Sequence, residues 1–476
     1  MNSLLNRLKK ITLPTKEVLP PLCGRLSRVV GLTLECTGIK VPIGTRCRIE
    51  TGSGPMFAEA VGFSGKTTYL MPAEEISGVE NGDLVVPLGD RDEIPYSDAL
   101  LGRVLDGAGH PIDGLGPLIR KGSSRRILRR VNPMDRRPIR EPMDVGVRCI
   151  NALFTVGQGQ RMGLFAGSGV GKSVLLGMMT RGSSADVAVV GLVGERGREV
   201  KEFIDEILGE EGRRRSVVVA APADASPLMR LKGCETSLSI AEYFRDQGKN
   251  VLLLIDSLTR YAMAQREIAL AVGEPPATKG YPPSVFAKLP ALVERAGQGN
   301  GKQGSITAFF TVLTEGDDLQ DPIADSARAI LDGHIVLSRA LADAGHYPAI
   351  DVEKSISRVM PAVVTQEHLV MARTIRQCTA TYNESRELIQ IGAYRQGSDP
   401  RVDQAVMIHP YIDEFTQQDF RAVIPYAQSV EDMKKIAMIL IGDAQKRTEQ
   451  LQRQQPQVPK TNAVQNNAFT RSDRQG

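Results

Sequence analysis

Through the middle of the chain, nearly continuous apolar segments alternate with stretches of helical periodicity such as Glu199–Leu208 and Ser237–Gln247. An uninterrupted apolar run is typical of a strand that is buried on both faces of a sheet. The alternation therefore predicts an α/β core, with a mostly parallel sheet covered by helices. The expected strands are Arg161–Ala166, Asp186–Val193, Ser216–Ala221, Val251–Asp256 and Ser305–Leu313.

The first part of the chain has a different pattern. Short β-like runs, among them Leu26–Val30, Arg46–Glu50 and Leu84–Pro87, are separated by Gly, Pro and Asn. This spacing predicts a small antiparallel β-barrel over residues 22–95, and a turn-rich segment then leads into the core domain at 96–362.

After the core the periodicity becomes helical, over 366–395 and 429–445, with a break at Gly397–Pro400. We expect a small helical domain over residues 363–445.

The two ends of the chain lie outside these domains. Residues 1–21 begin with alternating apolar and basic positions, which predict a short amphipathic helix at Asn2–Ile11 and a docking arm. Residues 446–476 are rich in Gln, Asn and Arg and poor in large apolar side chains, so we expect a disordered tail.

Composition narrows the class of protein. Of the 476 residues, 42% are hydrophobic and 24% charged, as in ordinary globular proteins, and no uncharged apolar stretch is long enough to span a membrane. The net charge of +4 is too small to argue for nucleic-acid binding. The six cysteines contain no CxxC pair and the five histidines show no metal-ligand spacing, which favours a reduced, cytoplasmic setting without a zinc site.

The main chemical motif follows the first expected core strand, where Phe165–Ser173 reads as a phosphate-binding loop. Its glycines allow a tight turn whose amides face phosphate oxygens, while Lys172 would reach the terminal phosphates and Ser173 would offer a hydroxyl to Mg²⁺. Ala166 stands where such loops usually begin with Gly. The residues expected to bind nucleotide here are Ala166, Gly167, Ser168, Gly169, Val170, Gly171, Lys172, Ser173 and Val174.

Two carboxylates lie at the ends of expected core strands. Asp256 would lie at the carboxyl edge of the sheet. Taken alone, it would be read as a cap of the next helix, but the phosphate loop upstream favours a role in holding Mg²⁺. Glu195 is placed to orient and polarise the attacking water, the alternative being a surface salt bridge with Arg196 or Arg198.

Two further residues lie downstream. Arg358 could neutralise charge at a neighbouring subunit's phosphates, but the residues alone favour an ordinary ion pair. Tyr347, on a loop flanked by Gly and Pro, could stack on adenine or simply be a packed tyrosine.

Five long segments carry a resemblance to a known family: Ala166–Met179, Gly194–Lys201, Leu254–Glu267, Gly273–Phe286 and Asp321–His334. With them, residues 22–445 resemble the beta subunits of rotary ATP synthases, and within that family the type III export ATPases of the bacterial flagellum. The resemblance implies a RecA-like core, and Ala166 is similar to what the export branch shows.

The resemblance also implies roles. ATP and Mg²⁺ would be the ligands, with Glu195, Lys172 and Arg358 catalytic and with Ser173 and Asp256 at the metal. Arg196 and Arg260 would support the phosphates, Tyr347 would stack on adenine, and Arg358 would act across a subunit interface.

The family further implies a ring, usually a homohexamer, that is cytoplasmic and peripheral to the inner membrane. A stator-like regulator would bind the N-terminal helix, and the helical domain would meet the export gate, chaperones and substrates. Hydrolysis would energise flagellar protein export.

Four alternatives stay open: an export ATPase of a virulence injectisome, a catalytic subunit of a rotary synthase, a Rho-type RNA translocase, and a ring component that binds nucleotide without turnover. The Rho-type reading is weakened because residues 22–95 contain only Phe57, Phe63 and Tyr69 as aromatics.

Overall fold

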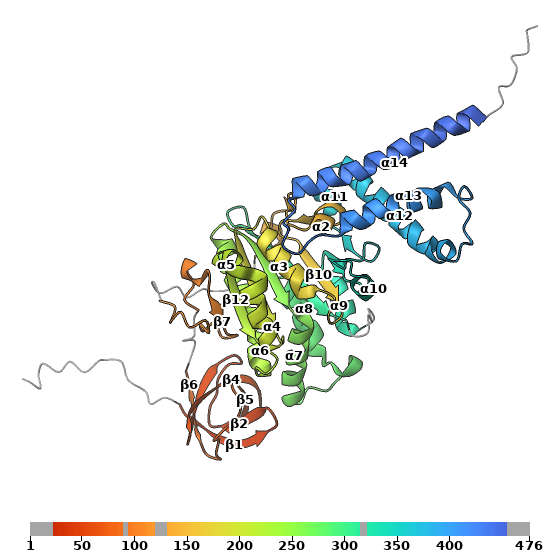
Figure 1. Cartoon of the computed structure of the whole chain (residues 1–476). Coiled ribbons are helices and arrows are strands. Elements are labelled where there is room, and N and C mark those ends of the chain that lie inside the picture. Colours follow the sequence, from red (N-terminus) through yellow and green to blue (C-terminus); the bar gives the residue numbers. More distant parts are fainter. Residues whose placement is uncertain (1–21, 89–93, 120–130, 315–320, 455–476) are drawn as a thin grey trace, which may run out of the picture.

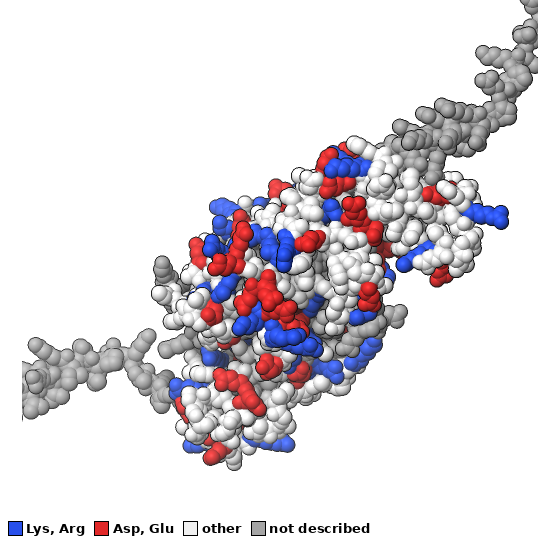
Figure 2. Space-filling model, in the orientation of Figure 1, with Lys and Arg blue, Asp and Glu red and all other residues white. Residues whose placement is uncertain are grey.

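The computed structural model describes residues 22–88, 94–119, 131–314 and 321–454, with side chains up to residue 440. Its chain forms three regions in a row, a barrel, a sheet flanked by helices and a group of long helices (Figure 1). Acidic and basic side chains are interspersed over the face shown in Figure 2. The predicted N-terminal helix and the end of the predicted tail lie outside the described residues.

The first region is a closed six-stranded barrel with strand order β1-β2-β5-β4-β3-β6. Alternate residues such as Leu26, Ile49 and Leu70 point inward and are almost completely buried, which is why the short alternating runs form a barrel. The predicted barrel is confirmed. Its strands are β1 (Gly24–Val30), β2 (Thr33–Thr37), β3 (Arg46–Thr51), β4 (Gly54–Ser64), β5 (Thr67–Pro72) and β6 (Leu84–Pro87).

The second region contains a sheet with the order β17-β16-β10-β15-β13-β11-β12-β7, in which β14 also pairs with β15. All neighbours from β16 to β7 along this order are parallel, and β17 is an antiparallel edge strand. The predicted α/β core is confirmed. Its strands are β7 (Val104–Leu105), β10 (Arg161–Ala166), β11 (Val187–Val193), β12 (Ser216–Ala221), β13 (Asn250–Asp256), β14 (Gly297–Gln298), β15 (Ser305–Leu313), β16 (Gly333–Val336) and β17 (Ile356–Ser357).

Helices cover both faces of this sheet. Val190 and Leu254 pack with helix α3 on one side, whereas their neighbours Val189 and Leu253 pack with α6, α7 and α8 on the other. Because successive strand side chains alternate between faces, each strand contributes to two separate cores. The helices of this region are α2 (Arg148–Leu153), α3 (Lys172–Gly182), α4 (Gly197–Glu202), η3 (Phe203–Leu208), α5 (Gly209–Arg214), α6 (Pro227–Asp246), α7 (Leu258–Ala271), α8 (Pro283–Val293), α9 (Pro322–Ile330), α10 (Arg339–Asp343) and α11 (Met360–Val363).

The third region consists of α12 (Gln366–Gln390), α13 (Pro400–Thr416) and α14 (Tyr426–Gln454), which pack on one another and on α2. The sequence pattern missed α13, which begins at the predicted break, where the Asp399 side chain accepts a hydrogen bond from the Arg401 amide. Helix α12 ends before the predicted residue 395, since Gly392 adopts φ 70° just beyond it.

Helix α14 continues to Gln454, past residue 446, where the predicted tail begins. Gln, Arg, Glu and Lys lack an apolar face to bury but are good helix formers, so low hydrophobicity alone does not end a helix. Among the described residues, no helix combines the length and apolar composition needed to cross a membrane.

Candidate nucleotide site

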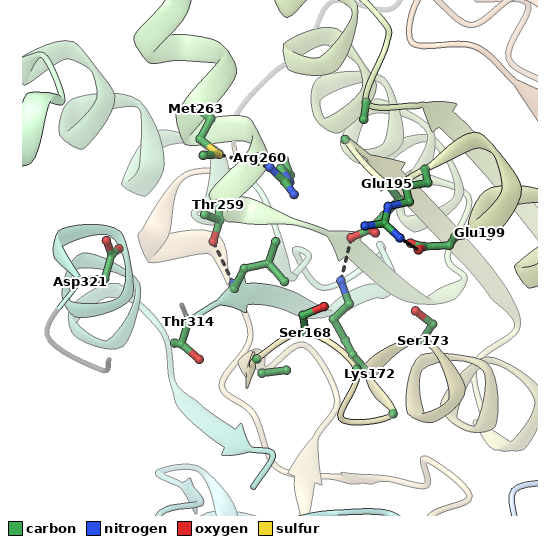
Figure 3. A pocket seen from close by; sticks show the side chains of 18 of the residues that line it. Ser168, Lys172, Ser173, Glu195, Glu199, Thr259, Arg260, Met263, Thr314 and Asp321 are labelled. Atoms are coloured by element: carbon green, nitrogen blue, oxygen red, sulfur yellow. Dashed lines mark hydrogen bonds and ion pairs between the residues drawn. The ribbon is translucent and has the colours of Figure 1, made fainter. Parts of the chain in front are cut away.

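A cavity of about 1180 Å³ opens at the carboxyl end of the parallel sheet (Figure 3). The loop between β10 and α3 forms one wall, and α7 contributes to another. Ligands of open parallel sheets bind at this edge, because the loops there splay apart. The predicted site residues that line the cavity are Ala166, Gly167, Ser168, Gly169, Gly171, Lys172, Ser173, Val174, Glu195, Arg196 and Arg260.

The phosphate loop has the backbone that its sequence predicts. Gly169 and Gly171 adopt φ of 77° and 90°, a region that favours glycine. Val170, between them, is buried in the core and does not line the cavity. Ala166 needs no such freedom, because it is the last residue of β10 and pairs with Leu313 of β15. The alanine therefore fits a strand position, and the departure from the usual pattern has no cost.

Lys172 lies between two carboxylates. Its Nζ is 2.8 Å from Oε1 of Glu195 and 2.6 Å from Oδ1 of Asp256. Burial opposes the charge of the ammonium group, but the two carboxylates outweigh that effect and raise the pKa of Lys172. The lysine is therefore a fixed cation at the base of the cavity, and Figure 3 shows it pointing toward Glu195.

Asp256 lies beneath this lysine at the end of β13, and its side chain is only 2% exposed. Burial raises the pKa of Asp256 above the usual range, an effect that the charge of Lys172 opposes. The reading of Asp256 as a helix cap is wrong, because Ser257 caps α7 by accepting a hydrogen bond from the Arg260 amide. The peptide bond between Asp256 and Ser257 is cis.

Glu195 extends from the end of β11 into the cavity, whereas its neighbour Arg196 is largely exposed and pairs with Glu199 at 3.5 Å. Glu195 therefore makes its ion pair with Lys172 and not with the adjacent arginine. Arg260 packs over Gly194, where a Cβ atom would lie 2.7 Å from the Arg260 Cγ. Since Gly194 also has φ 73°, glycine is required there to let Arg260 line the cavity.

Tyr347 does not line the cavity, but it lies next to Gly171 of the phosphate loop. A Cβ atom at Gly171 would be 3.4 Å from the Tyr347 ring, and 46% of the tyrosine is exposed. The loop that carries it is tied to the helical region, because the Gln418 amide donates to the Tyr347 carbonyl at 2.9 Å. His346 Nδ1 also lies 3.0 Å from Asp413 Oδ1 of α13.

Arg358 is exposed and follows the edge strand β17, away from the cavity that its own chain forms. Its guanidinium donates to the Arg328 carbonyl at 3.3 Å. Among the residues that the structure describes it makes no ion pair, so the ordinary ion pair favoured by the residues alone is not found there. One chain therefore does not bring Arg358 to the other predicted catalytic residues.

Arg339 and Thr311 are among the residues of the site that sequence reasoning missed. Arg339, at the start of α10, lines the cavity and donates to the Ser168 carbonyl at 2.8 Å, a contact between distant segments that no local pattern signals. Thr311 donates to Asp256, and its signal was a polar residue inside the apolar strand Ser305–Leu313.

Three family models match the chain. They are the β-barrel domain of the ATP synthase alpha/beta family at residues 26–89, its nucleotide-binding domain at 146–357, and the T3SS EscN ATPase C-terminal domain at 364–435.

Similar proteins and structures extend the match along the chain. The flagellum-specific ATP synthase of Pseudomonas aeruginosa is 58% identical over 91% of this chain and 95% of its own length. That of Salmonella typhimurium is 60% identical over 83% and 89%. The assembled ATPase EscN from the type III secretion system of enteropathogenic E. coli has a TM-score of 0.82 and 43% identity, covering 87% of this chain and 99% of that one.

Proposed function

The chain belongs to the ATP synthase alpha/beta family and is an ATPase, and from this premise we propose that it hydrolyses MgATP to energise flagellar protein export. The observation that carries the proposal is the position of Lys172, held between Glu195 and Asp256 where the phosphate loop meets the cavity. In this arrangement Lys172 supplies positive charge for the phosphates and the Asp256 carboxylate supplies a ligand for a metal. The Glu195 carboxylate supplies a base for water.

The residues present fit Mg²⁺. Ser173 offers a hydroxyl at the start of α3 and Asp256 a carboxylate at the end of β13, which are the oxygen donors that this cation prefers. These two residues would hold the ion, which when bound would neutralise charge on the β- and γ-phosphates.

The protein's own groups divide the remaining work. The amides of the phosphate loop bind the phosphates at the N-terminus of α3, where the helix dipole favours an anion. Lys172 turns from its carboxylate partners to the phosphates, and this frees the Glu195 oxygen to orient the attacking water. Arg260 and Arg196 support the phosphates from the cavity wall, and Tyr347 stacks on the adenine.

Arg358 completes the site of a neighbouring protomer. Arg358 is exposed and does not line its own cavity, and both facts support this role. The role requires a ring, and we propose a homohexamer. EscN has been solved in an assembled form and in complex with its central stalk EscO, which supports assembly and a stalk-like partner for this chain as well.

The flagellar system is favoured over an injectisome by similarity. The flagellum-specific relatives reach 58% and 60% identity, whereas the type 3 secretion system ATPase of Xanthomonas euvesicatoria is 48% identical. We place the protein in the cytoplasm at the inner-membrane export apparatus. Its partners there are a stator-like regulator at residues 1–21 and the export gate, chaperones and substrates at the helical region.

Complementation between two inactive variants tests the shared site. Glu195→Gln should lower ATP turnover by about 10²–10⁴-fold while nucleotide binding persists. Arg358→Ala should lower it by about 10³–10⁵-fold. In a mixture of equal amounts, about one interface in four pairs an intact Glu195 with an intact Arg358, so activity should return as protomers mix.

The controls are each variant alone at the same total concentration, and a mixture of Glu195→Gln with the double variant, which contains no intact Glu195 and should stay inactive. If the first mixture is no more active than its components, Arg358 does not act across an interface. If wild-type protein has no Mg²⁺-dependent ATPase activity at any concentration, the proposed hydrolysis is wrong.

A further inference from the structure

A buried hydroxyl group contacts Asp256 from the neighbouring strand. Thr311 lies on β15, between the strand that leads to the phosphate loop and the strand that ends at Asp256. It is fully buried, and its Oγ1 donates to Asp256 Oδ1 at 2.6 Å. Nothing in the proposed chemistry uses this side chain so far.

The hydroxyl has one proton and two acceptors within reach. The Ile255 carbonyl lies 3.4 Å away, whereas the Asp256 carboxylate is much closer. A hydrogen bond to a charged acceptor is shorter and stronger than one to a neutral carbonyl, so the Thr311 hydroxyl directs its proton to the Asp256 carboxylate. Thr311 is also β-branched, which restricts its χ1 angle and fixes the direction of the hydroxyl.

Both hydrogen bonds to Asp256 fall on one oxygen. Lys172 and Thr311 each donate to Oδ1, and Oδ2 accepts no hydrogen bond from any residue that the structure describes. The carboxyl group is thereby held with Oδ2 as the oxygen available to a ligand. When phosphates draw Lys172 away, Thr311 is the described donor that stays on Oδ1.

We propose that Thr311 is a positioning residue that orients Asp256 toward Mg²⁺ once nucleotide has engaged Lys172. This inference rests on the proposed function and adds a residue to it. Thr311 does not line the cavity, and it acts through the carboxylate by preventing rotation about the last side-chain bond of Asp256.

The same strand supplies a matched control. Thr307 is also buried on β15, but its Oγ1 accepts a hydrogen bond from the Gly159 amide at 2.8 Å. Thr307→Val and Thr311→Val therefore make the same change of shape and polarity in one strand, and only the second removes a contact to Asp256.

The test measures two quantities on the full-length protein. Thr311→Val should lower kcat for MgATP by about 10–100-fold, the range expected when a hydrogen bond to a charged group is lost. The second quantity is the affinity for a fluorescent ADP analogue in Mg²⁺ and in EDTA. The gain in affinity on adding Mg²⁺ should shrink in Thr311→Val and stay as in wild type in Thr307→Val, while the affinity in EDTA stays the same in all three proteins.

Conservative replacement separates the hydroxyl from packing. Thr311→Ser keeps the hydroxyl and loses a methyl group, whereas Thr311→Ala loses both, so the serine variant should recover most of the activity and of the Mg²⁺-dependent gain. Equal values for Thr311→Ser and Thr311→Ala would overturn the inference, and this comparison holds even if the valine variants fold poorly. Equal values for folded Thr311→Val and Thr307→Val would overturn it as well. An inactive wild-type enzyme would instead reject the proposed hydrolysis.

Discussion

The two ends of the nucleotide site are built in different ways. At the phosphate end, Lys172, Asp256 and Thr311 all belong to the sheet region and are buried against one another. At the base end, where the adenine base is proposed to stack on Tyr347, the loop of that tyrosine is held by groups from the helical region. In the proposed site the phosphates would therefore contact the sheet region alone, whereas the adenine would contact a loop held by the helical region.

The junction between the sheet region and the helical region is rich in polar contacts. The Arg148 guanidinium donates to the Phe415 carbonyl at 2.7 Å, and the Gln418 side chain donates to the Gly146 carbonyl at 2.9 Å. Hydrogen bonds to backbone carbonyls fix direction more than they add stability, because each replaces a bond to water. We expect the helical region to shift when the adenine base binds.

The largest effect in this comparison should come from removing the aromatic ring at the base end. Tyr347→Ala should raise KM for ATP by about 10-fold or more, the loss expected from one stacked base, and leave kcat little changed. Steady-state kinetics over a range of ATP concentrations would measure this. Tyr347→Phe keeps the ring and should behave like wild type. A loss in kcat with an unchanged KM would instead place Tyr347 with the phosphate end.

A smaller rise in KM should follow from weakening the attachment of the Tyr347 loop while the tyrosine ring is kept. Asp413→Ala removes the partner of His346 and should raise KM for ATP by about two- to fivefold, the value of one modest hydrogen bond. The same kinetic measurement applies.

The matched control for that variant is Asp403→Ala on the same helix. Asp403 accepts hydrogen bonds from the Tyr394 hydroxyl and the Gly397 amide, on the loop between α12 and α13. Its replacement should leave KM unchanged. If both aspartate variants raise KM equally, the effect reflects the stability of α13 and not the link to Tyr347.

The smallest effect concerns pH. His368 of α12 lies between the two regions, with Nε2 2.7 Å from the Ala152 carbonyl, and burial lowers its pKa. The unfolded histidine takes up a proton near pH 6.5 while the folded one does not, so stability falls as the pH drops below about 6.5, by at most about 1.4 kcal/mol per pH unit. This loss ends at the lower pKa of the folded state.

Thermal unfolding between pH 7.5 and pH 5.5 would test this sign. Wild type should lose more stability on acidification than His368→Gln, which cannot titrate but keeps a side-chain donor. Equal losses in the two proteins would show that His368 does not hold the regions together through its neutral form.

The sequence predicted the phosphate end far better than the base end. Strands such as Ser216–Ala221 are continuous apolar runs, and the phosphate loop is one local motif, so both can be read from neighbouring residues. Helix α13 was missed because its polar face and internal Pro410 hide the periodicity. The contacts of Arg339 with Ser168 and of Gln418 with Tyr347 join segments far apart in the chain, and only the fold brings them together.

The ion pairs of Lys172 have a consequence for the approach of ATP. A triphosphate carries several negative charges, and two bare carboxylates at the bottom of the cavity would repel it. With the ammonium group seated between them, the entrance presents a far weaker repulsive field to an incoming anion. Lys172 thus screens the charge of the two carboxylates until the phosphates of ATP compete for its ammonium group.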